Sequence, residues 1–155
     1  MKVDRNYGDL LPFNYQYEQS AVIYRILAQA DTQYSSWLHE NGYLLHERKR
    51  FKLFCYSPFI FEKVRPLPEA GCLKIIDERA VWYISFIPEK STLEFIQGIF
   101  AHQSFSIGNK KYQVAFDVVG VEAIPMPQLS EGMTFVALSP ICVKLHEDNK
   151  TQYLS

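Results

Sequence analysis

The sequence predicts an α+β protein of the ferredoxin-like class, with the element order β-α-β-β-α-β, extra C-terminal strands and a first strand that is short or missing. Helical periodicity occurs in two separate stretches, and runs of branched and aromatic residues lie between and after them. Hydrophobic residues make up 48% of the 155 residues and charged residues 21%. This length and composition are typical of one globular domain, which we expect to span 1–155.

The predicted elements of the first half are, in order, a weak strand at 2–4, an extended segment at 10–15, helices at 16–30 and 32–41, and a strand at 51–63. Ala21, Tyr24 and Leu27 recur at helical spacing and predict the first helix. Asp31 is the expected N-cap of the second helix, and Gly42 is expected to end it.

The predicted elements of the second half are, in order, a loop at 66–71, a hairpin of 72–77 with 80–87, a helix at 89–102, a hairpin of 104–107 with 110–124, a strand at 133–145 and a turn at 147–150. Pro88 favours a helix start, and Leu93 and Phe100 are expected to line one face of that helix. The pair Gly108-Asn109 is a two-residue hairpin turn signal.

Composition excludes several classes of function. The net charge of −1 excludes a globally basic nucleic-acid clamp but leaves room for a local basic patch. Apolar stretches are too short to span a membrane, and the N-terminus has no signal peptide, so we expect a cytoplasmic protein. The chain has no G-x-G-x-x-G and no H-E-x-x-H motif, and therefore we expect neither a cofactor nor a metal.

One dense cationic run occurs in the chain, at 46–50, and it contains Arg48, Lys49 and Arg50. Such a run is a solvated loop in many proteins, and it is also the kind of patch that contacts RNA phosphates. The sequence leaves both interpretations open.

Three other residues form a loose group whose chemistry suits RNA cleavage without a metal. Tyr24 lies on the first predicted helix, His39 at the end of the second, and Lys52 at the start of the following strand. Cleavage requires a proton to leave the 2′-hydroxyl, a proton to reach the 5′-oxygen, and a cation beside the phosphorane. An imidazole titrates near neutral pH and suits proton transfer. Each residue also has an ordinary structural interpretation, as a core tyrosine, a helix cap and a solvated lysine.

Five sequence words occur in a fixed order around these residues: Leu11–Tyr17 (LPFNYQY), Ala21–Leu27 (AVIYRIL), Trp37–Glu40 (WLHE), Phe51–Ser57 (FKLFCYS) and Leu138–Ile141 (LSPI). Together they resemble the CRISPR-associated Cas-six endoribonucleases of the RAMP superfamily, which cut the repeat transcript into guide RNAs. The resemblance runs from about residue 10 to 143.

The resemblance implies an RRM-like domain equivalent to the N-terminal half of a two-domain enzyme, with the second domain and its Gly-rich loop absent. It implies metal-independent cleavage of CRISPR repeat RNA that leaves 2′,3′-cyclic phosphate and 5′-hydroxyl ends. His39 would be the general acid or base, Tyr24 would assist proton transfer, and Lys52 would stabilise the phosphorane. Arg48, Lys49 and Arg50 would contact RNA.

Two hypotheses about function follow from this resemblance. The first is an endoribonuclease domain acting on precursor CRISPR RNA in antiviral defence. The second is a truncated, non-catalytic RNA-binding or scaffold module of a CRISPR complex. The face left without a second domain can drive formation of a homodimer, and other CRISPR-associated proteins are further expected partners.

Overall fold

The computed structural model describes residues 1–45, 49–125, 128, 130–134, 136, 143–147 and 150–154. The chain divides into two compact units, Met1–Val121 and Glu122–Ser155. Within these described residues, the first unit contains the helices and most of the strands, and the second contains one hairpin. The described helices include none that is long and apolar enough to cross a membrane.

The first unit mixes helices with antiparallel strands, which confirms the predicted α+β class. Its helices are α1 (Gln16–Ala30), α2 (Thr32–Glu40) and α3 (Glu89–Ala101), with a 3₁₀ turn η1 (Pro68–Ala70). Its strands are β1 (Lys2–Asp4), β2 (Leu10–Pro12), β3 (Tyr43–Leu45), β4 (Lys49–Phe51), β5 (Phe54–Tyr56), β6 (Val64–Leu67), β7 (Cys72–Ile75), β8 (Ile84–Phe86), β9 (Ser104–Gly108) and β10 (Gln113–Asp117).

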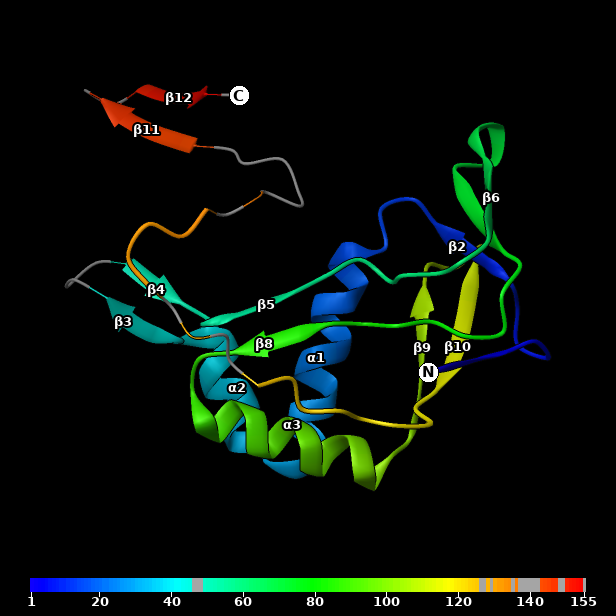
Figure 1. Ribbon diagram of the computed structural model, residues 1–155, viewed down its shortest axis with the longest axis horizontal. Coiled ribbons are helices and arrows are strands. Elements are labelled where there is room, and N and C mark those ends of the chain that lie inside the picture. The colour runs from blue at the N-terminus through cyan, green and yellow to red at the C-terminus, as the bar shows by residue number, and fades with distance from the viewer. Residues whose placement is uncertain are drawn as a thin grey trace. The chain divides into compact units, whose positions relative to one another are not determined.

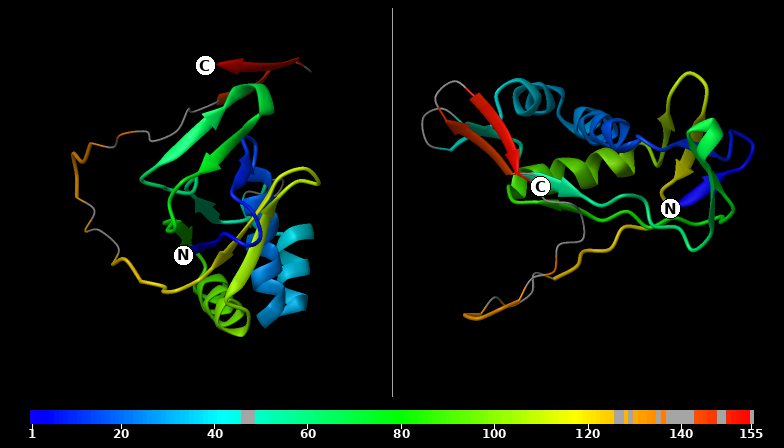
Figure 2. Two further views of the ribbon diagram at one scale, coloured as in Figure 1. Left: turned by 90° about the vertical axis from the view of Figure 1, so that its right-hand side faces the viewer. Right: turned by 90° about the horizontal axis from the view of Figure 1, so that it is seen from above.

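The strands of the first unit pair as two three-stranded sheets, β1-β10-β9 and β2-β7-β6, and two two-stranded sheets, β3-β4 and β5-β8. All of these pairs are antiparallel. Figure 1 shows the β3–β4 hairpin at one end of this unit and the β9–β10 hairpin toward the other, with β5 and β8 running between them. The views in Figure 2 show the helices gathered on one side of β5 and β8.

The structure confirms the three helices predicted from the sequence. The residues expected to begin and end α2 also act as predicted. The Asp31 carboxylate accepts a hydrogen bond from the Tyr34 N–H at 2.8 Å, as an N-cap does. Gly42 has φ 65°, and a Cβ there would lie 2.8 Å from the Phe51 carbonyl oxygen. Only glycine fits this conformation and this close approach, so α2 ends there and the chain turns into β3.

The buried faces of the helices differ from the faces that spacing suggested. The buried residues of α1 are Gln19, Val22, Ile23, Ile26 and Leu27, while Ala21 is exposed. On α3, Leu93 is 53% exposed and Phe100 is 64% exposed. The side buried instead carries Ser91, Phe95, Gly98 and Ile99. α3 packs on α1 at this side, where Gly98 lets the two helix backbones approach closely.

The predicted hairpin of 72–77 with 80–87 is wrong. β7 pairs with β2 and β6, whereas β8 pairs with β5. The segment 66–71, predicted as a loop, contributes Pro66 to β6, which is an edge strand where a residue without an N–H is tolerated. A local alternation of apolar residues fixes strand character, but it does not fix which strand becomes the neighbour.

Two further strand predictions need correction in their bounds. The strand at 51–63 is interrupted at Leu53, a non-glycine residue with φ 56°. Phe51 ends β4, 54–56 form β5, and Ile60 forms an isolated bridge with Val81. The β9–β10 hairpin is confirmed, but its loop is longer than two residues, since Gly108 pairs with Gln113. Its second strand is shorter than the predicted 110–124, because β10 ends at Asp117 and 118–124 lie outside any strand.

The second unit holds the antiparallel pair β11 (Val143–Glu147) and β12 (Lys150–Leu154). Glu147 pairs with Lys150, and residues 148–149 of the expected polar turn lie outside the described residues. Met133, Thr134 and Val136 lie outside any strand, contrary to the strand predicted at 133–145, and the rest of that segment before 143 lies outside the described residues.

Aromatic rings make up much of the core of the first unit. Phe59 lies at its centre, with its ring centroid 4.8 Å from that of Phe116, 5.2 Å from Trp82 and 5.4 Å from Tyr15. The Phe59 N–H donates a hydrogen bond to the Tyr15 hydroxyl at 3.1 Å. This cluster joins the start of α1 to β10 and holds the helices in place against the strands.

Candidate active site

Three separate elements bring Tyr24, His39 and Lys52 together. Tyr24 lies half-buried in the middle of α1, and His39 lies exposed in the last turn of α2. Lys52 lies in the two-residue link between β4 and β5. The centroids of the Tyr24 and His39 rings are 4.9 Å apart in an edge-to-face arrangement, and the Lys52 ammonium contacts the backbone of His39.

The close packing of α1 and α2 has a local cause in the sequence. Asp31 alone separates the two helices, so α2 turns back beside α1 immediately. The Ser35 hydroxyl then donates to the Tyr24 carbonyl oxygen at 2.8 Å. This hydrogen bond fixes the level at which the two helices meet, and His39 follows one helical turn after Ser35 on the same side of α2.

The Tyr24 phenol lies in a partly desolvated aromatic setting. Its ring packs edge-to-face on Phe54 with a centroid distance of 5.6 Å, in addition to its contact with His39. Burial raises the pKa of Tyr24 above its ordinary value, and the neighbouring Tyr56 raises it further. Because burial disfavours the phenolate, Tyr24 stays protonated at neutral pH and can donate a proton or a hydrogen bond.

Lys52 lies against the C-terminal end of α2. Its ammonium donates to the Leu38 carbonyl oxygen at 2.6 Å and also to that of His39. The C-terminus of a helix carries a partial negative charge, which a cation at this position offsets. The next residue, Leu53, has φ 56°, and a non-glycine side chain in this region is uncommon and costs free energy. The backbone strain therefore lies directly beside one of the predicted site residues.

The structure describes the cationic run at 46–50 only in part. Arg48 lies outside the described residues, and of Lys49 and Arg50 the structure describes the backbone, which pairs with β3. Their assignment as RNA contacts stays a prediction.

Sequence reasoning missed the polar cluster that holds α2 in position. The Tyr34 hydroxyl hydrogen-bonds the Tyr43 hydroxyl at 3.0 Å and also the Ser91 hydroxyl. Burial raises the pKa of Tyr34 to about 12. The cluster joins α2, β3 and the first turn of α3. Tyr34 and Ser91 are 57 residues apart along the chain, so no local sequence pattern predicts their contact.

The fold of antiparallel strands and packed helices is of the ferredoxin-like class, which solved CRISPR-associated proteins share. Residues 10–117 match the family model described as "CRISPR-associated protein Cas6, N-terminal". The match covers more than half of the chain, and the protein therefore belongs to the Cas6 family.

Individual relatives agree with this assignment. The CRISPR-associated endoribonuclease Cas6 of Pyrococcus furiosus is 24% identical over 148 residues, which cover 96% of this chain and 52% of the relative. A solved structure described as a Cas6-related gene product of the same organism superposes with a TM-score of 0.71 at 25% identity, and it covers 95% of this chain and 56% of that one. A structure described as "An RAMP protein binding different RNA substrates" has a TM-score of 0.68, the same identity and the same coverage. The chain thus spans about half the length of the relatives that it matches.

Proposed function

We propose that this chain carries the catalytic residues of a metal-independent endoribonuclease that processes CRISPR repeat RNA, as the N-terminal domain of a two-domain enzyme. The reaction is attack of a 2′-hydroxyl on the adjacent phosphorus, with departure of the 5′-oxygen. Its products are a 2′,3′-cyclic phosphate and a 5′-hydroxyl. The names of the relatives support the substrate class, since they are CRISPR endoribonucleases and RNA-binding RAMP proteins.

The observation that carries the proposal is the contact of Tyr24 with His39, beside the Lys52 ammonium, at an exposed end of α2. A histidine placed only for packing would be enclosed by apolar side chains, whereas His39 is open to solvent. An RNA backbone can therefore reach the imidazole without any opening of the core.

The chemical roles follow from these surroundings. His39 exchanges a proton with the 2′-hydroxyl or the leaving 5′-oxygen, because an imidazole can act as either acid or base near neutral pH. Tyr24 is a donor rather than a base, since burial keeps its phenol protonated. It assists proton transfer or stabilises a developing charge on oxygen.

Lys52 supports phosphate binding through its position on α2. A bare helix C-terminus repels an anion, since its terminal carbonyl groups carry partial negative charge. The ammonium of Lys52 lies on two of these carbonyl oxygens and offsets that charge. Its remaining positive field favours the phosphorane more than the ground-state phosphate, because the negative charge on the phosphorane is larger.

The test is cleavage of repeat RNA in EDTA by the protein that carries this chain, with the wild type compared with His39→Ala and His102→Ala. We expect His39→Ala to reduce the rate by about 10²–10⁴-fold, the usual contribution of a general acid or base. His102→Ala is the matched control, because His102 is also an exposed histidine at a helix end, on α3. Cyclic-phosphate ends identify the reaction.

An unchanged rate in His39→Ala would remove the imidazole from the mechanism. RNA binding without any cleavage by the wild type would instead favour the alternative, a non-catalytic RNA-binding or scaffold module. Equal melting temperatures of the two variants would show that loss of activity is not loss of fold.

A further inference from the structure

A small network of aromatic side chains joins α2 to the hairpin that leads to Lys52. Tyr43 is the first residue of β3, and its hydroxyl hydrogen-bonds the Tyr34 hydroxyl on α2 at 3.0 Å. The Tyr43 ring also packs edge-to-face on Trp37, with ring centroids 5.1 Å apart. These two contacts tie the beginning of β3 to α2, the helix that carries His39.

Tyr34 is held firmly enough to act as the anchor of this network. Its hydroxyl also hydrogen-bonds the Ser91 hydroxyl in the first turn of α3, and Ser91 is fully buried. The Lys90 ammonium lies over the Tyr34 ring, 4.6 Å from its centroid. Because α2 and α3 both hold this phenol, it stays in place when β3 moves. The Tyr43 hydroxyl therefore has a rigid partner.

The position of β3 determines where the backbone beside Lys52 lies. Tyr43 is the register partner of Phe51, which is the last residue of β4, and Lys52 follows directly. On the other side of this link, the Leu53 carbonyl oxygen accepts a hydrogen bond from the Ile87 N–H at 2.9 Å. The β4–β5 link is therefore held at both of its ends, and Figure 1 shows it joining the β3–β4 hairpin to β5.

The link needs to be held because its backbone is strained. Leu53 has φ 56°, a conformation that costs a non-glycine residue free energy and persists only where surrounding contacts impose it. The Lys52 ammonium meanwhile lies on the carbonyl oxygens of Leu38, at 2.6 Å, and of His39. If the contacts on one side of the link are lost, the strain relaxes and the ammonium moves. A displacement of about 1 Å in an active site can cost about 10²-fold in rate.

We infer that the Tyr43 hydroxyl is a positioning group for Lys52, because its bond to Tyr34 holds the β4–β5 link in the conformation that keeps the ammonium beside His39. Tyr43 acts through Lys52 and is not itself a catalytic residue. The inference rests on the proposed function, in which Lys52 stabilises the phosphorane. An interaction made mainly in the transition state affects kcat, so loss of the Tyr43 hydroxyl should lower kcat and leave KM nearly unchanged.

The test is a double-mutant cycle on the kcat of repeat-RNA cleavage in EDTA, with the protein that carries this chain. Tyr43→Phe keeps the ring contact with Trp37 and should lower kcat about tenfold, the equivalent of one hydrogen bond. Lys52→Ala should lower kcat about 10²-fold. Independent effects would multiply to about 10³-fold in the double variant. We expect the double variant to match Lys52→Ala instead, because Tyr43→Phe can displace no ammonium once Lys52 is gone.

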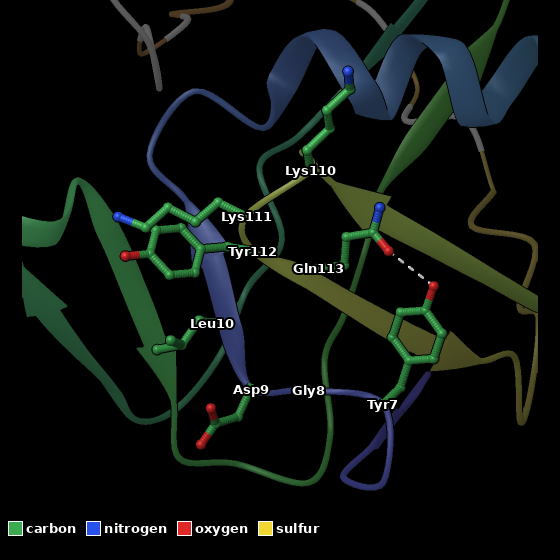
Figure 3. Close-up of a pocket in the computed structure, with 8 residues that line it drawn as sticks. All are labelled: Tyr7, Gly8, Asp9, Leu10, Lys110, Lys111, Tyr112 and Gln113. Carbon is green, nitrogen blue, oxygen red and sulfur yellow. Dashed lines mark hydrogen bonds between the residues drawn. The ribbon is translucent and has the colours of Figure 1, made fainter.

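Tyr7→Phe is the matched control, because it removes the same group from another tyrosine that links two elements. The Tyr7 hydroxyl donates to the Gln113 side-chain oxygen at 2.9 Å, drawn as a dashed line in Figure 3. This bond lies beside a pocket of about 340 Å³, where the β1–β2 link meets the β9–β10 loop. In Figure 1, β2 and the β9–β10 hairpin lie at the end of the first unit opposite the β3–β4 hairpin. Tyr7→Phe should therefore keep the kcat of the wild type.

A wild-type kcat in Tyr43→Phe would overturn the inference, and so would a loss that persists unchanged in the Lys52→Ala background. An equal loss in Tyr7→Phe would overturn it too, because the effect would then follow from loss of any such hydroxyl. All rates are measured well below the melting temperature of each variant, so that a loss of rate is not a loss of fold. Cleavage by the wild type, compared with His39→Ala, judges the proposed function separately, so the two failures are distinguishable.

Discussion

At the scale of single residues, the proposed chemistry depends on a phenol kept neutral by its surroundings. Tyr24→Phe removes the hydroxyl but keeps the ring contacts with His39 and Phe54. We therefore expect RNA cleavage to slow by about 10²-fold, as for loss of a proton-transfer group, while the melting temperature changes little. Tyr17→Phe on the same helix is the control, since Tyr17 is 82% exposed. Equal cleavage rates in the two variants would assign Tyr24 to packing alone.

Tyr34 gives a residue-scale prediction about stability and pH. Its folded-state pKa is raised from 10 to about 12, mainly by burial, so the folded protein holds this proton more tightly than the unfolded chain. The resulting stabilisation is fully present below pH 10 and is lost as the pH rises toward 12. We expect Tyr34→Phe to show a smaller fall in melting temperature over this alkaline range than the wild type.

Tyr34→Phe should also lower stability at neutral pH. It leaves the buried Ser91 hydroxyl and the Tyr43 hydroxyl without their shared partner, at a cost of about 1–2 kcal/mol in the free energy of unfolding. Tyr83→Phe, at a half-exposed tyrosine, is the comparison. Thermal melts from pH 7 to above pH 11 test both effects, and parallel curves for the two variants would contradict the role assigned to Tyr34.

At the scale of elements, the sequence predicted the helices well because their signals are local. A cap such as Asp31 and a stop such as Gly42 act within a few residues, and both are observed. The pairing of β7 with β2, rather than with β8, depends on contacts at least 60 residues apart along the chain, and no local pattern encodes that choice. Leu53 shows the same limit, because its positive φ depends on the link between two strands.

The N-cap of α2 gives an element-scale prediction, because α2 carries His39. Asp31 accepts from the Tyr34 N–H and forms an ion pair with Lys90 at 3.3 Å. Asp31→Ala removes both interactions and should lower the melting temperature by a few degrees, whereas Asp31→Asn keeps the cap acceptor and should lower it less. Thermal melts of the three proteins test this, and equal losses in both variants would place the effect in the ion pair.

The same carboxylate predicts an acid response. The backbone N–H of Tyr34 lowers the pKa of Asp31 first, and the bond to Lys90 lowers it further. A lowered folded-state pKa stabilises the protein above the ordinary carboxyl pKa, and this stabilisation is lost as the pH falls through the folded value. The difference in melting temperature between the wild type and Asp31→Ala should therefore shrink below about pH 4.

The crossing of α3 over α1 gives a second element-scale prediction. A Cβ at Gly98 would lie 1.9 Å from the Ile26 carbonyl oxygen, so the two helices approach closely through this glycine. Alanine ordinarily favours a helix over glycine by about 1 kcal/mol, yet here the clash must separate the helices. We expect Gly98→Ala to lower the free energy of unfolding by about 1–3 kcal/mol. Gly120→Ala, with nothing within 4 Å of its Cβ, is the control in urea denaturation.

At the scale of the whole molecule, the proposed site could be predicted from the sequence only because the short segments around its residues resemble those of a known family. Spacing alone favoured a core role for Tyr24 and a cap for His39, and the structure places Tyr24 half-buried and His39 exposed, with their rings in contact. The pocket beside Tyr7 had no sequence signal, because its two loops are about 100 residues apart and meet only when β1 pairs with β10.

The division of the chain predicts that the first unit folds without the second. Among the residues whose burial the structure describes, the buried core cluster runs from Val3 to Phe116, and the family match ends at residue 117. A chain of residues 1–121 should therefore unfold cooperatively in urea, with a midpoint close to that of residues 1–155. A chain that ends at residue 111 is the control, since it lacks β10 and with it Val114 and Phe116, which are fully buried. We expect this shorter chain to lose the cooperative transition, because the edges of β1 and β9 and the ring of Phe59 would lose their partners. If residues 1–121 also fail to unfold cooperatively, then residues 122–155 are required for folding and the chain is a single folding domain over its whole length.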